Sequence, residues 1–143
     1  MKKWILPLLV LLLPLAAAAQ PQLAEIAAHL QSERVSLHYD CTYTDEAPVK
    51  LSGDLVIQGD CYSAKGNGVE IYSDGATRWT VDPASKEVYI EAADGLAELV
   101  AYRDSLSELK ITGLKYLPLL EDLSAFRFDT ASLDSSWVVT DLR

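Results

Sequence analysis

The side chains best suited to metal chemistry are two histidines and two cysteines, His29, His38, Cys41 and Cys61. Structural zinc sites use four such ligands in short paired spacings, and these positions match no zinc pattern. His38 and Cys41 would also point to opposite faces of one strand, since side chains alternate along a strand. We therefore expect no metal site, and we expect His38 to be a solvated histidine beside Asp54.

Catalytic motifs are not evident either. The chain contains no nucleophile elbow, no phosphate-cradling glycine loop and no metalloprotease helix. The G-N-G at 66–68 fits a hairpin turn. A carboxyl poised for acid–base work needs an apolar pocket, but the acids here fall mostly in turns or on one charged strand face. We expect a protein that is not an enzyme and uses no cofactor.

Residues 1–19 have the composition of a secretory signal peptide. Lys2 and Lys3 precede an apolar run from Trp4 to Leu15, and four alanines then lead to Gln20. The run is shorter than the about 20 apolar residues that a spanning helix needs. We expect cleavage after Ala19 and no membrane span in the mature chain. A membrane anchor is the alternative, and exported material that still carried Lys2 would support it.

The excess of acidic residues restricts the classes of partner that the protein can bind. The chain has 12 Lys+Arg against 21 Asp+Glu, a net charge of −9, and loss of a leader with two lysines and no acids takes this to −11. An acidic exported protein repels nucleic acid and anionic lipid headgroups. No linker or repeat divides residues 20–143, so we expect a single domain.

Hydrophobic periodicity predicts one amphipathic helix followed by a meander of short strands. Between Pro21 and about Arg34 the apolar stripe consists of Leu23, Ile26, Ala27 and Leu30. From Val35 the period changes to two, as expected for strands. Gly59-Asp60 suits a type II′ hairpin turn and Asn67-Gly68 a type I′ turn. A four-residue turn is expected from Pro83 to Lys86. The N-terminal helix is the obvious cover for the apolar face of the sheet.

The connection at 73–75 determines the register of the central strands, because a slip of one residue turns every side chain to the other face. We expect a three-residue loop with Gly75 left-handed, which pairs Val69 with Trp79 and Glu70 with Arg78. One face would then carry Leu55, Ala64, Ile71, Val69, Trp79 and Ile90. The other would carry a ladder of alternating charge, namely Asp54, Lys65, Glu70, Arg78 and Glu91.

The second half of the chain is less regular. Residues 96–106 suggest a short second helix, and residues 109–116 suggest a bent strand around Gly113. Phe126 and Phe128 alternate as in a short strand, and Trp137, Val138 and Val139 suggest another.

The stretch S-D-G-A-T-R-W-T-V-D-P-A-S-K-E-V-Y-I at 73–90 resembles the D-G-x-x-x-W-x-x-(D/N)-P-x-x-(K/Q)-(E/Q)-V pattern of LolA, the periplasmic carrier of outer-membrane lipoproteins. It is most similar to the LolA-like proteins of Bacteroidetes-type bacteria. L-V-I-Q-G-D-C-Y at 55–62, F-R-F-D at 126–129 and V-V-T-D-L-R at 138–143 resemble further parts of the family. The chain departs from the family in a shorter second half and in the absence of the Arg-Pro after the third-strand aromatic, where Cys61-Tyr62-Ser63-Ala64 stands. The Arg is tied to lipoprotein transfer in the family, so the resemblance bears on fold more than on transfer.

The resemblance implies an α+β fold: a curved antiparallel sheet, an incomplete β-barrel, with the N-terminal helix and the short second helix over its concave apolar face. It implies a periplasmic carrier that shields lipoprotein acyl chains in a cavity, with the inner- and outer-membrane lipoprotein-transport machinery as partners. The candidate cavity residues are Leu23, Ile26, Leu30, Leu37, Leu55, Ile57, Tyr62, Ile71, Trp79, Val81 and Ile90. The alternative is an interaction module with a filled core. On the cavity hypothesis the fluorescence of Trp79 should respond to lipopeptide.

The two cysteines are expected to stay unpaired, although exported proteins often form disulfides. The expected register places Cys41 across from Leu51 and Cys61 across from Gln58. These positions are far apart along one strand, whereas a disulfide needs Cα atoms within about 7 Å.

Overall fold

The computed structural model describes residues 21–44, 46–93 and 106–143. The expected signal peptide (residues 1–19) lies outside these ranges. The expected second helix (residues 96–106) also lies outside them, except for residue 106. The described elements are α3 (Pro21–His29), β1 (Arg34–Thr44), β2 (Pro48–Gln58), β3 (Cys61–Gly66), β4 (Val69–Ser73), β5 (Thr77–Asp82), β6 (Glu87–Ala92), β7 (Leu106–Leu117), the 3₁₀ turns η3 (Leu123–Phe126) and η4 (Thr130–Ser132), and β8 (Val138–Asp141). No helix in these parts of the chain is long and apolar enough to cross a membrane.

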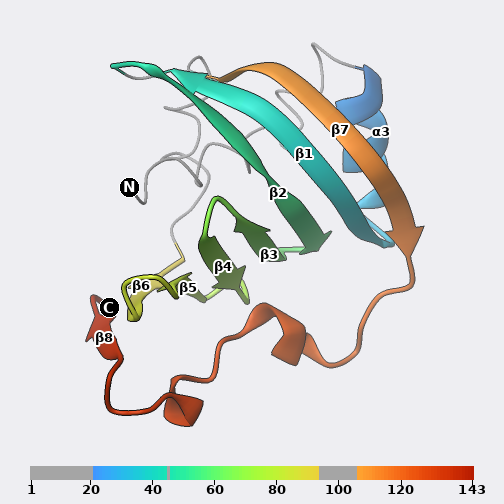
Figure 1. Ribbon diagram of the computed structural model, residues 1–143. Helices are drawn as coiled ribbons and strands as arrows, with labels where there is room; N and C mark the ends of the chain where they lie inside the picture. The colour runs from blue at the N-terminus through green and yellow to red at the C-terminus, as the bar shows by residue number, and fades with distance from the viewer. Residues whose placement is uncertain (1–20, 45, 94–105) are drawn as a thin grey trace.

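The eight strands form a single curved sheet that does not close, in the order β7-β1-β2-β3-β4-β5-β6-β8 (Figure 1). All neighbours pair antiparallel except β6 and β8, which are parallel. The expectation of a curved, antiparallel-rich sheet is therefore confirmed. The parallel edge strand was not expected; it arises because the chain from β7 to β8 runs around the sheet before it returns to β6 (Figure 1).

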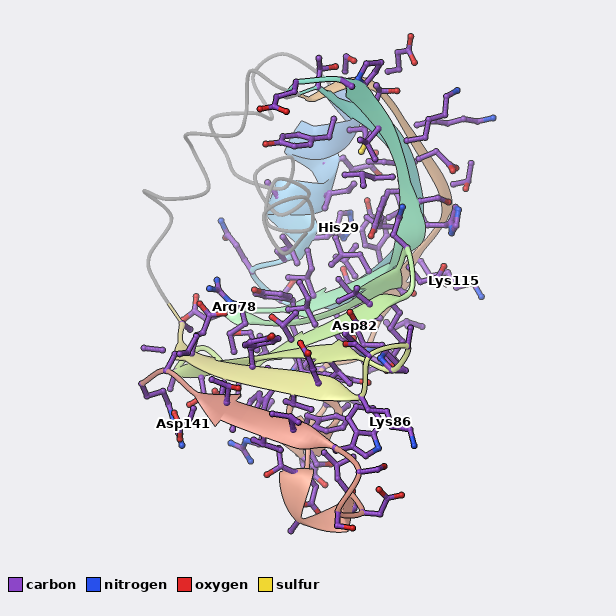
Figure 2. The ribbon with its side chains drawn as sticks, turned by 60° about the vertical axis from the view of Figure 1, so that its left-hand side comes forward. His29, Arg78, Asp82, Lys86, Lys115 and Asp141 are labelled. Atoms are coloured by element: carbon purple, nitrogen blue, oxygen red, sulfur yellow. The ribbon has the colours of Figure 1, made fainter. Side chains whose placement is uncertain are left out.

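The helix lies on the concave side of the curved sheet (Figure 2). It ends at His29, some residues before the expected end near Arg34, where β1 begins. Ile26 is fully buried against the side chains that point inward from β1 and β2. This first core contains Ile26, Val35, Leu37, Tyr39, Cys41, Tyr43, Leu51, Leu55, Ile57, Ala64 and Ile71. The strict alternation of buried and less buried residues along β1 confirms the period-two pattern.

Three of the expected turns are present. Gln58 pairs with Cys61 around Gly59-Asp60, and Gly59 has φ +57°, as a type II′ turn requires at that position. Asn67 and Gly68 both have positive φ, as in a type I′ turn. Asp82 pairs with Glu87 around the four-residue turn 83–86. The expected registers of β1–β2, β2–β3, β3–β4 and β5–β6 are confirmed as a result.

The register of β4 against β5 was predicted wrongly. Tyr72, not Val69, lies opposite Trp79, and Ser73, not Glu70, lies opposite Arg78. The pairing differs from the expected one by three residues, an odd number, so the side chains of β5 and β6 change faces. The charge ladder is broken between Glu70 and Arg78.

Asp74 explains the longer connection. Its carboxylate accepts hydrogen bonds from the backbone N–H groups of Ala76 and Thr77 at 3.0 and 2.9 Å, and its own N–H donates to the Thr77 carbonyl. The turn is thereby centred on Gly75 and Ala76, and Gly75 has the expected left-handed conformation, φ +91°. Arg127 donates from Nε to the same carboxylate at 3.0 Å. A side chain that accepts hydrogen bonds from nearby backbone N–H groups can determine the length of a turn when the residue types are compatible with several lengths.

This carboxylate should make the stability depend on pH. Burial alone would raise the pKa of Asp74, but hydrogen bonds from Thr77 and Ala76 and the charge of Arg127 lower it below its ordinary value. A lowered folded-state pKa contributes stability above the unfolded-state value of about 3.9 that is lost as the pH falls through the folded-state value. We expect Asp74→Asn to lose less stability than the wild type between neutral and acidic pH, measured by urea unfolding. An Asp74→Asn variant with the full wild-type pH dependence would contradict this.

Beyond β7, residues 118–137 form a strap that passes along the side of the sheet opposite to α3 (Figures 1 and 2). Phe126 lies in a 3₁₀ turn and is 1% exposed, so the strand expected around Phe126 and Phe128 is wrong. The expected last strand exists as β8, although it begins after Trp137. The bent strand expected at 109–116 is part of β7, whose pairing with β1 shifts near Glu108 and Gly113, both with positive φ.

The strap and the far end of the sheet enclose a second core. Val81, Val88 and Ile90 are its buried members, and Tyr72, Trp79, Phe128, Leu133 and Trp137 pack against it. Because of the changed register, this cluster forms on the outer face of the sheet, behind the face that carries the first core.

Both cysteines are free and buried. Cys41 lies opposite Leu51, and Cys61 lies opposite Gln58, so both cysteines occupy the expected strand positions. The distance between these positions was the reason for expecting no disulfide.

Candidate functional site

Seven of the eleven candidate cavity residues lie together on the concave side of the sheet, five of them on strands and two, Ile26 and Leu30, in α3 or directly after it. Five are buried members of the first core, and two pack against it from partly exposed positions. The buried five are Ile26, Leu37, Leu55, Ile57 and Ile71, and the other two are Leu30 and Tyr62. The strand residues form an apolar wall that runs from β1 to β4, with the helix over part of it (Figure 2).

The remaining four candidates are not placed on this wall. Trp79, Val81 and Ile90 belong to the second core on the outer face, because of the register described above. The side chain of Leu23 lies outside the described part of the structure. Trp79 therefore cannot report directly on a ligand at the concave wall, and the fluorescence response expected from it loses its geometric basis.

An open cleft of about 480 Å³ lies at one end of the wall. The end of α3, the β2–β3 turn, the β4–β5 turn and the strap surround it. Its lining residues are Leu30, Gln31, Gln58, Gly59, Asp60, Cys61, Asp74, Gly75, Ala76, Leu119 and Leu123. The cleft is open to solvent, and its lining mixes three leucines with polar residues of the two turns.

Two contacts connect the cleft to the rest of the molecule. The Gln58 amide donates to the Leu120 carbonyl and accepts from the Leu120 N–H, both at 2.8 Å, and so fixes the strap beside the sheet. Leu30 lines the cleft and also packs against the first core. The apolar wall and the cleft therefore share a side chain.

A buried arginine lies next to this wall, although it was expected on the charged face. Arg78 is 7% exposed, and its guanidinium is 3.3 Å from the Glu91 carboxylate. Burial raises the pKa of Tyr62, and the nearby Arg78 guanidinium opposes that shift.

The position of Arg78 follows from the strand pairings. Side chains directly opposite one another across neighbouring strands share a face. One such row crosses the sheet from β1 to β6 and consists of Val35, Ile57, Tyr62, Ser73, Arg78 and Glu91. The row is apolar at one end and charged at the other. No residue-type signal could have revealed it, because it depends on the one register that the turn residues did not determine.

The charged outer face carries the expected histidine contact. His38 Nδ1 lies 3.0 Å from the Asp54 carboxylate, and Nε2 lies 3.2 Å from the Ser52 hydroxyl. His38 and Asp54 are both well exposed. Across the described ranges no three His, Cys, Asp or Glu side chains gather closely enough to hold a metal ion.

Comparison with models of known protein families finds no match, and comparison with curated proteins finds none either. A function must therefore be inferred from the geometry of the wall, the cleft and the Arg78 row.

Proposed function

We propose that this protein is a periplasmic carrier that shields the acyl chains of outer-membrane lipoproteins, with neither catalysis nor a cofactor. The observation that supports it best is the apolar inner wall of an unclosed, curved sheet that meets an open cleft at one end. The resemblance of residues 73–90 to the LolA pattern agrees with this proposal. The driving force would be apolar burial, about 0.8 kcal/mol for each CH₂ group removed from water.

A second candidate is a non-catalytic interaction module with a filled core. The observation in its favour is the edge strand β8, where Val138 and Val139 are 60% and 42% exposed and Leu142, just beyond the strand, is 61% exposed. An exposed strand edge can pair with another chain. Uptake of a fluorescent fatty acid that lipopeptide displaces separates the two, since a filled core would take up no probe.

A matched pair of leucine variants tests the carrier more sharply. Leu119 lines the cleft and is 52% exposed, so Leu119→Glu should fold normally. We expect it to weaken uptake of the fatty acid by about tenfold or more, because a charged side chain replaces apolar surface that the bound chain would otherwise cover. Leu142→Glu places the same charge at a similarly exposed leucine beyond β8, and we expect it to leave uptake unchanged. Equal effects of the two variants would exclude the cleft as the entrance.

A further inference from the structure

We propose that two copies of this chain pair along β8, antiparallel and about a two-fold axis at Thr140, so that their sheets join into one. The inference does not depend on the carrier function, since β8 contributes no residue to the cleft. It assigns the exposed edge of the sheet to one partner, a second copy of the chain. A two-fold pairing uses the same surface on both copies, so that surface must be complementary to itself.

The two edges of the sheet, β7 and β8, differ in how well they resist pairing (Figure 1). Natural edge strands commonly carry lysines, prolines or β-bulges that discourage it. β7 carries Lys110 and Lys115, and two irregularities interrupt its pairing with β1. β8 contains neither lysine nor proline, and its pairing with β6 runs without irregularity. The carboxylate of Asp141 in β8 is neutralised by Arg143 at 2.7 Å. The edge suited to accept another strand is therefore β8.

The hydrogen bonds to β6 determine which backbone groups of β8 face outward. The N–H groups of Val138 and Leu142 donate to β6 carbonyls at 2.9 and 2.7 Å. Alternate residues of a strand direct their backbone groups to opposite edges, so those of Val139 and Asp141 face away from β6. Two outward-facing residues directly opposite each other in an antiparallel pair exchange both hydrogen bonds. A pairing centred on Thr140 places Val139 of each copy opposite Asp141 of the other and so forms two such exchanges.

The same register covers exposed apolar surface. Val138 and Leu142 are the two most exposed large apolar side chains in the described parts of the chain. They lie on one face of the strand, two residues before and two residues after Thr140. A pairing centred on Thr140 therefore places Val138 of each copy directly opposite Leu142 of the other, at positions where side chains come closest.

Other registers fit less well. A shift of one residue would set outward-facing backbone groups opposite groups already bonded to β6. A centre at Asp141 would place two carboxylates opposite each other, which is destabilising. A centre at Val139 would leave Leu142 without an apolar partner. The self-complementary arrangement is thus specific to Thr140.

The test is disulfide cross-linking of single cysteine variants under mild oxidation. In the proposed pair Thr140 lies opposite its own counterpart, with Cα atoms about 4.5 Å apart, within the range of a disulfide. Leu142 lies opposite Val138, and the two copies of Leu142 are about 14 Å apart along the strands. We expect Thr140→Cys to form at least about tenfold more covalent dimer than Leu142→Cys, although Leu142 is the more exposed side chain. The wild type is the background control, because Cys41 and Cys61 are buried.

A proline variant tests the backbone pairing. The N–H of Val139 faces away from β6, and edge strands tolerate proline at such positions. Val139→Pro in the Thr140→Cys background should therefore reduce the covalent dimer to the level of Leu142→Cys. The wild type should show concentration-dependent dimerisation in analytical ultracentrifugation, and Val139→Pro should not.

Equal cross-linking of Thr140→Cys and Leu142→Cys would overturn the proposed register. This comparison decides the register even if the proline variant does not fold. A wild type that sediments as a monomer at its highest soluble concentration would overturn the second copy as the partner of β8. Uptake of fatty acid is a separate readout, so loss of the dimer proposal would leave the carrier proposal standing.

Discussion

Replacement of Phe126 by alanine is expected to lower the free energy of unfolding by about 3–5 kcal/mol, the typical cost of removing a fully buried phenylalanine. Phe126 is 1% exposed and lies in the 3₁₀ turn η3, which packs against β3. Within residues 118–137 it is the one buried residue, so its loss would leave a cavity under the strap. Urea unfolding of the wild type and the variant measures the difference.

Phe128→Ala is the matched control. Phe128 is two residues further along the same strap, but it is partly exposed and packs against the edge of the second core, 5.7 Å between its ring centre and that of Tyr72. We expect a clearly smaller cost there, because less of the ring leaves the interior. A strand at 126–128 would instead put both rings on one face and make their costs similar. Equal losses from the two variants would thus contradict the observed turn.

Gly66→Ala is expected to destabilise the protein by about 1–3 kcal/mol or more, the usual range for overpacking. Gly66 pairs with Gly53 of the neighbouring strand. A Cβ added at Gly66 would lie 2.2 Å from the Ser52 carbonyl oxygen and 2.7 Å from the Gly53 Cα. Both are backbone atoms, so strand β2 itself would have to move.

Gly68→Asn separates this effect from a general need for glycine. Gly68 has φ +76°, and a Cβ there would meet nothing within 4 Å. Asparagine tolerates the left-handed conformation better than most residues, so the cost should stay well below that of Gly66→Ala. Thermal unfolding of both variants provides the comparison. A larger loss at Gly68 than at Gly66 would show that turn geometry, and not the close approach of β2 and β3, limits this hairpin.

Local patterns were sufficient for the first half of the sheet. Alternation along residues 35–43 and 49–57 identified the inward faces of β1 and β2, since a strand with one buried face must place an apolar residue at every second position. Gly59-Asp60 and Asn67-Gly68 identified the hairpin turns because positive φ at these positions favours particular residues. Together with the apolar stripe of the helix, these patterns correctly predicted one apolar cluster that contains Ile26, Leu37, Leu55, Ile57 and Ile71.

Prediction failed where long-range contacts compete with local ones. The Ser73-Asp74-Gly75 sequence is compatible with several loop lengths, and the carboxylate of Asp74 selects one of them with help from Arg127, which lies 53 residues further along the chain. The odd shift that results moves Trp79, Val81 and Ile90 to the outer face and Arg78 to the inner one. Similarly, the pattern of Phe126 and Phe128 suggests a strand, but the strap packs those rings into different places.

The sequence by itself therefore determined the strand faces, the tight turns and the apolar character of the inner wall, because each depends on neighbours a few residues away. The tertiary structure alone decided which face β5 and β6 present, where the strap closes on the sheet, and that a buried arginine adjoins the wall. The face that β5 and β6 present depends on one carboxylate shared between a turn and a distant arginine, and the strap is also held by the Gln58 amide. Hydrophobic periodicity does not reveal the contact between Asp74 and Arg127, because these two residues come together only when the chain has folded.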